Sequence, residues 1–571
     1  MASAPLGSSA WRRSSPRAGV RGAPILSLPG GTPKLVWCGR TAAFTAEARQ
    51  VHASAPRTAG WARLLREHRA IVLVALAALG VRLAVAVAYA PALFFSDSWR
   101  YVSLAYRSPL VGLAPDRPSG YPLILDLIAI PGQSLLAITT LQHAVGLIVG
   151  LLSYALLARL DAPRWMAALV AAVILFDSYA VTLEQHVMPE AFFALLLISS
   201  AGLTVAARRS AWAIGGAGVL LAAAVTLRTQ AVFAVPVWAL YVLWAHHRSR
   251  RTLVLAALAV TLPLAAYSGV HALRTGHAGM TQASGWFLYA RVGEIGDCRD
   301  ARIPAPAARL CDRGALDRLS GAEYHLWNPR SPANRLFPGG QGDPHANRVL
   351  HDYAVAIIRD RPRAYAQMVV GDFLRYFHPG VASRGDSDLA ITLPERPRTD
   401  PPWVNEHVRA AHFPTYSPPP AGARSPLLGA YQDWIHVPRW ALGSLVLATV
   451  LALMLALSTR LRPRLPHRRE AFLLVGMAVA MLLGSAATSE FVLRYLVPTV
   501  PLLLCGGALA ACDLGRLWAA RTNGLPRQRG IERLSDAARP HGTGQAPAGG
   551  RRFASPPAAP GRARTVEDSR R

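Results

Sequence analysis

The sequence predicts an all-α, polytopic membrane protein with about ten transmembrane helices, interfacial helices and one large external loop region. Of its 571 residues, 52% are hydrophobic and only 16% are charged, which is too apolar for a soluble protein of this length. Long apolar runs also recur, and about 20 apolar residues cross a bilayer as a helix because a helix satisfies its own backbone. The predicted spans are 69–90, 134–158, 165–183, 189–207, 211–227, 230–245, 252–273, 438–458, 470–488 and 491–513.

These spans divide the chain into regions. The first 30 residues lack an uninterrupted apolar run, so we predict no cleavable signal peptide. Both ends are rich in Arg, Ser, Pro and Ala, which is typical of disordered segments, and the fold is expected to begin near Trp61. We predict a disordered basic tail at 1–60, seven spans with a catalytic first external loop at 61–273, an extracytoplasmic loop domain at 274–436, the last three spans at 437–513, and a disordered basic cytoplasmic tail at 514–571.

The net charge of +29 does not indicate a nucleic-acid partner. The excess lies in the tails and in short loops rather than on one folded basic face, so we exclude nucleic-acid binding. Lys34 is the only lysine, and heavy use of Arg, Ala, Gly and Pro is typical of a GC-rich bacterial genome.

Arginines in alternate loops fix the orientation. Arg159 with Arg164, Arg208 with Arg209, and the segments 246–251 and 460–469 are basic and therefore predicted to be cytoplasmic. Ten spans then place both termini in the cytoplasm of a bacterium whose inner membrane holds the protein. The loops predicted to face outward, where the active face should lie, are 91–133, 184–188, 228–229, 274–436 and 489–490.

The acidic residues of the apolar region gather on this outer side. Asp97, Glu184, Glu190 and Glu490 all fall at the outer ends of predicted spans. Asp97 opens a short amphipathic helix, where a partly buried carboxylate can act as a general base. An N-cap is an equally good explanation, because the sequence Ser-Asp-Ser before a helix favours capping. The following residues, Arg100 and Tyr101, are candidate substrate-binding residues.

Basic and aromatic residues on the same side suit an anionic headgroup. Arg117 and Tyr121 lie in a rigid Pro- and Gly-containing turn, where the arginine suits phosphate, although both can simply anchor the interface. Segment 119–131 is too short to span and is placed at the interface. Arg228, between two spans, either binds lipid phosphate or snorkels to the surface.

Two further clusters carry charge at this face. Glu184, His186 and Glu190 are costly at a membrane surface unless paired, and they suit acid/base chemistry, metal binding or recognition of sugar hydroxyls. Glu190 also suits the start of a helix, where an acid stabilises the dipole. Glu490 and Arg494 stand at helical spacing, so an ion pair on one helix face explains both.

The external segment is predicted to be structured. Apolar periodicity over 345–379 indicates two amphipathic helices broken at Pro362, which are expected to roof the cavity. Cys298 and Cys311 lie in the same segment, in an oxidising location, and are predicted to form a disulfide; two unpaired thiols are the alternative.

Taken with the terminal RYLVPTVPLLL (494–504), these features resemble the membrane glycosyltransferases of the type C superfamily, in particular its protein O-mannosyltransferase-like or aminoarabinose-transferase-like branch. The resemblance covers about 61–513 and implies a polyprenyl-phosphate sugar donor used at the outer face. It implies that Asp97 is the first-loop catalytic acid, that Glu184 and Glu190 form the second acidic cluster, and that Arg494 and Tyr495 bind lipid phosphate. The branch often has two adjacent acids where this chain has Asp97-Ser98. This departure weakens the case for a divalent metal, which stays an alternative, and leaves the acceptor open.

The leading hypothesis is therefore a glycosyltransferase with a lipid-linked donor, which agrees with the lack of a Gly-rich phosphate loop. A transporter or flippase for a lipid or lipid-linked sugar is the alternative, and a non-catalytic scaffold is a third. Transporters place polar groups near the bilayer midplane, whereas here ionisable groups gather at the outer ends. The sequence does not identify the sugar, the acceptor or the oligomeric state.

Overall fold

The computed structural model describes residues 68–105, 116–206, 210–296, 302–311, 321–380, 382–383, 391–394, 413 and 425–524. All of them lie in one compact unit, Arg63–Arg571. Their secondary structure is helical apart from a single β-bridge between Leu93 and His186. The predicted tail at 1–60 lies outside the described residues. The predicted start of the C-terminal tail was too early, because residues 514–524 continue the last helix.

A helix lies at each of the ten predicted spans. Within the described residues, seven helical stretches are long and apolar enough to cross a membrane, and the bent pair α6 and α7 makes up to eight. Two more, α8 and α9, are apolar but have only 17 residues each, so the count of ten remains a prediction. The helices at these spans are α2 (Arg69–Ala88), α5 (Leu135–Arg159), α6 (Arg164–Phe176), α7 (Ser178–Gln185), α8 (Glu190–Ala206), α9 (Ala211–Leu227), α10 (Ala234–His246), α11 (Arg250–Thr275), α19 (Arg439–Leu455), α20 (Arg468–Thr488) and α21 (Val500–Gly524). Helix α18 (Pro426–Trp434) precedes α19 and lies outside the predicted spans.

Three spans differ from the straight helices that periodicity predicts. The stretch predicted as 230–245 begins with the 3₁₀ helix η1 (Thr229–Phe233) before α10. The stretch predicted as 165–183 bends by 46° between α6 and α7. The stretch predicted as 491–513 begins with two 3₁₀ turns, η6 (Leu493–Tyr495) and η7 (Val497–Thr499), before α21. Pro498 and Pro501 lack the amide hydrogens that an α-helix would need there.

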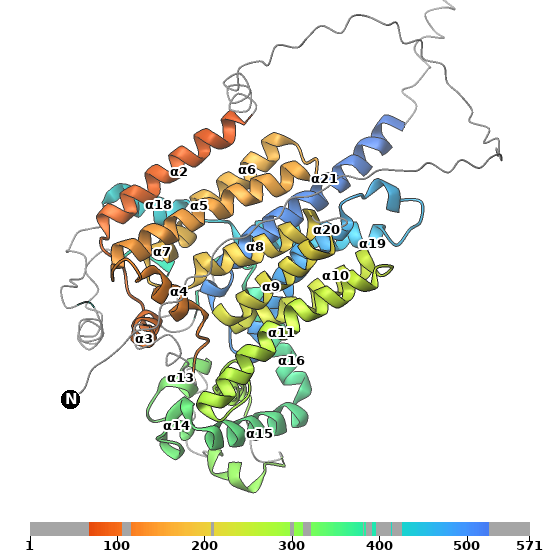
Figure 1. The fold of residues 1–571 in the computed structure, drawn as a ribbon. Coiled ribbons are helices and arrows are strands. Elements are labelled where there is room, and N and C mark those ends of the chain that lie inside the picture. The colour runs from red at the N-terminus through yellow and green to blue at the C-terminus, as the bar shows by residue number, and fades with distance from the viewer. Residues whose placement is uncertain are drawn as a thin grey trace, which may run out of the picture. The chain divides into compact units, whose positions relative to one another are not determined.

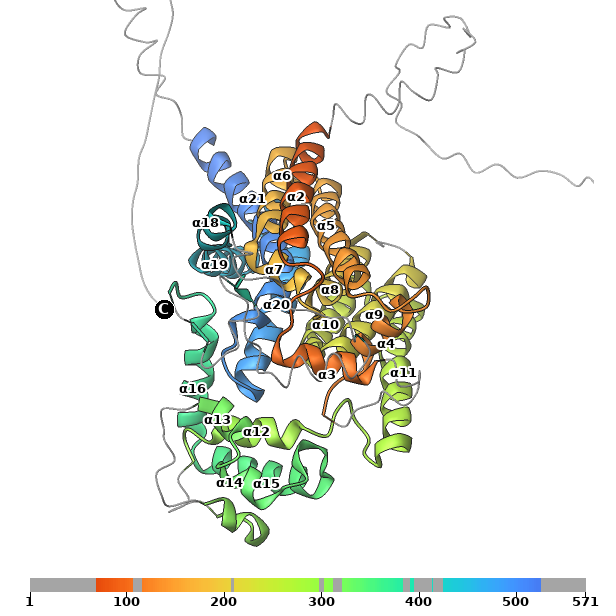
Figure 2. The ribbon, with the colours of Figure 1, turned by 90° about the vertical axis from the view of Figure 1, so that its left-hand side faces the viewer.

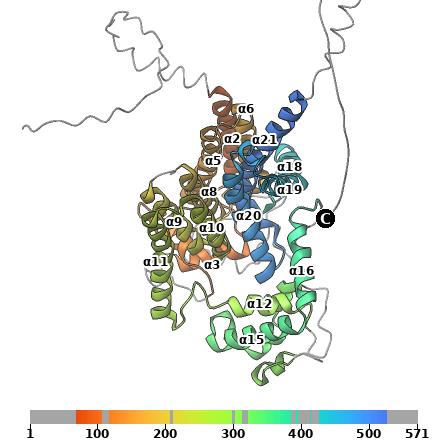
Figure 3. The same cartoon turned by 90° about the vertical axis from the view of Figure 1, so that its right-hand side faces the viewer.

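The helices pack as a bundle whose outer surface remains apolar. Contacts join α9 to α11 and α8, α5 to α6 and α8, and α21 to α19 and α20 (Figures 1 and 3). On α2, Leu73 and Val87 are 65% and 80% exposed, so a face of this helix has no partner among the described residues. Such a face is stable where lipid rather than water covers it.

A smaller group of helices lies at one end of the bundle (Figures 1 and 2). It has its own core, which includes Trp286, Leu350 and Ile357. The predicted helix pair broken at Pro362 is confirmed, because α15 ends at Asp360 and α16 begins at Pro362. The helices of this group are α12 (Ser284–Val292), α13 (Gly321–Trp327), α14 (Pro332–Leu336), α15 (Pro344–Asp360) and α16 (Pro362–Arg375).

Cys311, at the end of a 3₁₀ helix in this group, is disulfide-bonded. Its predicted partner, Cys298, lies outside the described residues, so the pairing itself remains a prediction. Cys505 and Cys512 are free thiols.

The predicted orientation can be tested by cysteine labelling. Ser331 would be a poor site because it is fully buried, whereas its neighbour Arg330 is exposed. We expect Arg330→Cys to react with a membrane-impermeant maleimide in intact cells, above the background of the unsubstituted chain. Arg248→Cys, in a loop predicted to be cytoplasmic, should react only after permeabilisation. The opposite labelling pattern would show that the predicted orientation is wrong.

Candidate functional site

A backbone strap joins the segment that follows α2 to the residues just before α8. The Leu93 amide donates to the Gln185 carbonyl at 2.9 Å, and the Val187 amide donates to the Leu93 carbonyl at 3.2 Å. Helix α3 (Ser96–Leu104) follows directly and carries Asp97 in its first turn. Its N-cap residue is Phe95, whose amide donates to Ser98 Oγ at 3.0 Å. The N-cap explanation for Asp97 is therefore wrong, and its carboxylate is available for other partners.

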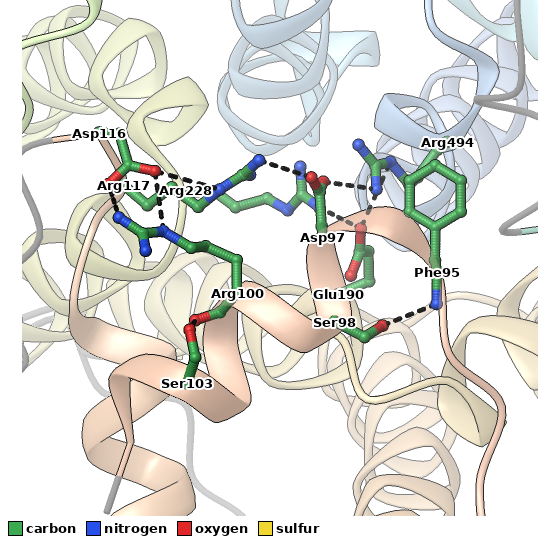
Figure 4. A network of polar contacts seen from close by, with 10 residues as sticks. All are labelled: Phe95, Asp97, Ser98, Arg100, Ser103, Asp116, Arg117, Glu190, Arg228 and Arg494. Atoms are coloured by element: carbon green, nitrogen blue, oxygen red, sulfur yellow. Dashed lines mark hydrogen bonds and ion pairs between the residues drawn. The ribbon is translucent and has the colours of Figure 1, made fainter. Parts of the chain in front are cut away.

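Asp97 lies between two arginines from distant parts of the chain (Figure 4). Arg117 Nη2 is 2.7 Å from Asp97 Oδ1, and Arg494 Nη1 donates to Asp97 Oδ2 at 3.0 Å. Burial on its own would raise the pKa of Asp97, but the positive charges of Arg117, Arg494 and Arg228 outweigh it and hold that pKa below its usual range. Asp97 is therefore ionised at neutral pH.

The ion pairs continue through Glu190, the first residue of α8. Arg228 Nη2 contacts Glu190 Oε1, and Arg494 Nε is 3.8 Å from the same oxygen. Three guanidinium groups thus surround two carboxylates, an excess of one positive charge. Beside them, Arg100 pairs with Asp116 at 2.7 Å. We call Asp97, Arg117, Glu190, Arg228 and Arg494 the charged cluster.

Aromatic rings support the faces of these guanidinium groups. Arg494 Cζ lies 4.9 Å from the centre of the Phe95 ring, and Arg228 Cζ lies 5.5 Å from that of Tyr495. Arg117 Cζ lies 5.8 Å from the ring of Tyr101. Stacking on a ring leaves the N–H groups at the guanidinium edge free to bind in its plane.

All members of the charged cluster except Glu190 line a cavity of about 580 Å³ between the bundle and helices α12 and α15. Within the described part of the chain, the buried Nε atoms of Arg117, Arg228 and Arg494 have no hydrogen-bond partner. An anionic group in the cavity would meet three guanidinium groups that carry an excess of positive charge. The lining also includes the apolar residues Leu227, Val232, Phe233, Met280, Phe287 and Leu288, and the histidines His277 and His351.

The structure brings together seven of the predicted residues. Asp97, Tyr101, Arg117, Arg228, Arg494 and Tyr495 all line this cavity, and Glu190 joins them through its ion pairs. Glu490 is buried but is not among the lining residues. Its predicted pairing with Arg494 along one helix face is wrong, because α20 ends at Thr488 and the next turn begins only at Leu493.

Three other predicted residues belong to a separate buried network. Glu184 accepts two hydrogen bonds of 2.8 Å from Arg82 and is 2.9 Å from His143 Nδ1. Tyr121 donates to Gln142 Oε1 at 2.7 Å, and His186 Nδ1 is 2.9 Å from the Thr182 carbonyl. Glu184 and Tyr121 thus link helices, whereas the His186 side chain contacts its own helix, α7.

Close packing of α5 makes this network possible. A Cβ on Gly146 would lie 1.8 Å from Glu184 Oε1, a distance that real Cβ atoms do not show. We therefore expect Gly146→Ala to push the carboxylate away from Arg82 and to lower the melting temperature, measured by intrinsic fluorescence of the solubilised protein. Gly202→Ala, where nothing lies within 4 Å, is the matched control. Equal melting temperatures for both variants would contradict this geometry.

A divalent metal does not fit the described residues of the site. No three His, Cys, Asp or Glu side chains gather there in a group that can hold a metal ion, and both oxygens of Asp97 already contact arginines. We therefore assign no step to a metal.

Sequence reasoning missed several partners. Arg82 gave a usable signal, since a lone arginine in an apolar run needs a counter-charge. His143 and Asp372 gave none, because their partners Glu184 and Arg291 lie in distant segments. Asp116 pairs with the nearby Arg100, a contact that no sequence pattern marks.

Comparisons with known proteins add one structure. No family model matches the chain, and no curated protein is similar to it. A solved structure of the archaeal oligosaccharyltransferase AglB from Archaeoglobus fulgidus, in complex with an inhibitory peptide and a dolichol-phosphate, aligns with 83% of this chain at 15% identity and a TM-score of 0.34. The alignment covers 54% of that protein, so the chain spans about half of its length.

Proposed function

We propose that this protein is a membrane glycosyltransferase that moves a sugar from a polyprenyl-phosphate donor to an acceptor on the outer face of the membrane. One observation carries the proposal. The largely buried guanidinium groups of Arg117, Arg228 and Arg494 surround the ionised carboxylate of Asp97 beside a cavity with a partly apolar lining. A lipid phosphate supplies the anion and the apolar group that such a cavity fits.

The charged cluster can stabilise the leaving group. Arg117, Arg228 and Arg494 would bind the donor phosphate and neutralise the charge that grows on it as the bond from the sugar carbon to the phosphate oxygen breaks. The electron pair leaves with the polyprenyl phosphate. The acceptor oxygen or nitrogen forms the new bond to the same carbon and gives its proton to Asp97.

The paired state also explains how Asp97 becomes a better base. In the structure its charge is stabilised by Arg117 and Arg494, which weakens its affinity for a proton. A bound phosphate would share those guanidinium groups and remove part of this stabilisation. The pKa of Asp97 would then rise towards its usual range, so that proton uptake becomes easier only when the donor is present.

The test is reconstitution of the full chain in liposomes with radiolabelled polyprenyl-phosphate hexoses and pentoses. We expect sugar transfer or release with at least one donor. Asp161→Asn, which changes an exposed acid that is not among the cavity-lining residues, should retain the activity. Movement of the donor between leaflets without loss of its sugar would instead support the flippase alternative, and no turnover with any donor would overturn the proposal.

A further inference from the structure

Arg494 follows a short segment whose backbone is hydrogen-bonded to α16 and to the residues that follow α16. Between the end of α20 and η6, the chain is not helical, so its amides need partners other than helix carbonyls. Three consecutive amides find them outside the bundle. Phe491 N–H donates to Asp372 Oδ2 at 3.3 Å, Val492 N–H to the Tyr376 hydroxyl oxygen at 3.5 Å, and Leu493 N–H to Ser383 Oγ at 2.7 Å.

The three acceptors are themselves fixed. Asp372 is 2.7 Å from Nη1 of Arg291, a residue only 1% exposed, and 3.2 Å from Nη1 of Arg375. The Tyr376 ring is fully buried and lies 4.8 Å from the Phe491 ring. Burial raises the pKa of Tyr376, so its hydroxyl stays neutral. The segment is therefore held from the side of α16 by rigid groups.

The same helix also fixes the end of α20. Tyr365, near the start of α16, donates its hydroxyl hydrogen to the Ala487 carbonyl at 2.8 Å. Contacts on both sides of the break between α20 and η6 thus come from one outer helix and the residues that follow it (Figure 2). Because both ends of this break are held, the backbone that leads into Arg494 has a fixed direction.

None of the three acceptors is among the residues that line the cavity, whereas the next two residues of the chain, Arg494 and Tyr495, are. We propose that Asp372, Tyr376 and Ser383 form a clamp that positions Arg494. Residues that do not line the anion site would thus set its geometry. The clamp residues act through Arg494 and are positioning residues. The role of Arg494 towards a lipid phosphate rests on the proposed function.

The first experiment tests the clamp without any substrate. Asp372→Asn would also leave the buried Arg291 without its counter-charge, so the double variant Tyr376→Phe/Ser383→Ala is preferred. Hydrogen exchange of the solubilised full chain should become about fivefold to tenfold faster at the amides of Val492 and Leu493, whose acceptors are removed, the effect of losing hydrogen bonds of ordinary strength. Tyr324→Phe/Ser444→Ala, with changes on α13 and α19, should leave these amides unchanged. Equal protection in both double variants would overturn the clamp.

The second experiment tests what the clamp does. In liposomes with the active donor, we expect the clamp variant to raise the donor KM about tenfold, because a misplaced Arg494 binds phosphate less well, with the acceptor KM unchanged. Faster exchange with an unaltered donor KM would show that the segment is held but does not position Arg494, and the inference would fail. If the unsubstituted chain turns over no donor, the proposed function fails, while the exchange result still decides whether the clamp exists.

Discussion

Asp97→Asn is expected to stop sugar transfer and, at the same time, to strengthen binding of the lipid phosphate. An amide cannot take the proton of the acceptor, and loss of a general base costs roughly 10²–10⁴-fold in rate. Binding should change in the opposite direction, because the charged Asp97 carboxylate competes with phosphate for Arg117 and Arg494. Removing it raises the excess positive charge of the cluster from one to two.

The two effects are measured separately. Transfer is followed with the radiolabelled donor in liposomes, and binding with polyprenyl phosphate lacking the sugar, by quenching of intrinsic fluorescence. A variant that loses both properties in parallel would indicate damage to the fold, so its melting temperature must be compared with that of Asp161→Asn. Transfer at the unsubstituted rate would remove Asp97 from the mechanism. Weaker binding would mean that Asp97 helps to place the arginines rather than competing for them.

The sequence predicted the elements better than their meeting points. Apolar runs located a helix at each predicted span and placed Asp97, Glu190 and Arg494 near the ends of such runs, because an apolar run is a local property of the chain. The same patterns do not specify which ends meet. Asp97 and Arg494 are 397 residues apart, and their contact depends on the strap between Leu93 and His186 and on the break after α20.

Two predictions show why the remaining details were out of reach. Glu184 and Glu190 looked equivalent from their spacing, yet one pairs with Arg82 inside the bundle and the other with Arg228 at the cavity. Helical periodicity assigns residues to a face but does not say which helix covers that face. The role of Asp372 could not be predicted either. It accepts a hydrogen bond from the backbone amide of Phe491, in a distant segment, and no sequence pattern marks such a contact.

Arg82→Met should cause the largest loss of stability of any single change considered for this protein. The side chains of Arg82 and Glu184 are only 2% and 4% exposed, and two hydrogen bonds of 2.8 Å join them. Removing one partner of a buried ion pair leaves an uncompensated charge and typically costs about 3–5 kcal/mol. We therefore expect a much lower melting temperature, or no solubilised folded protein.

The double variant Arg82→Met/Glu184→Gln separates charge from packing. Replacing both members of a buried pair by neutral residues of similar size is often close to neutral, and a glutamine can still accept the hydrogen bond from His143. We expect it to recover most of the melting temperature that the single variant loses. If it is as unstable as Arg82→Met alone, the arginine stabilises the bundle through packing and through its bond to the Leu175 carbonyl. If it also retains transfer, Glu184 is a structural residue, and the chemistry belongs to the charged cluster alone.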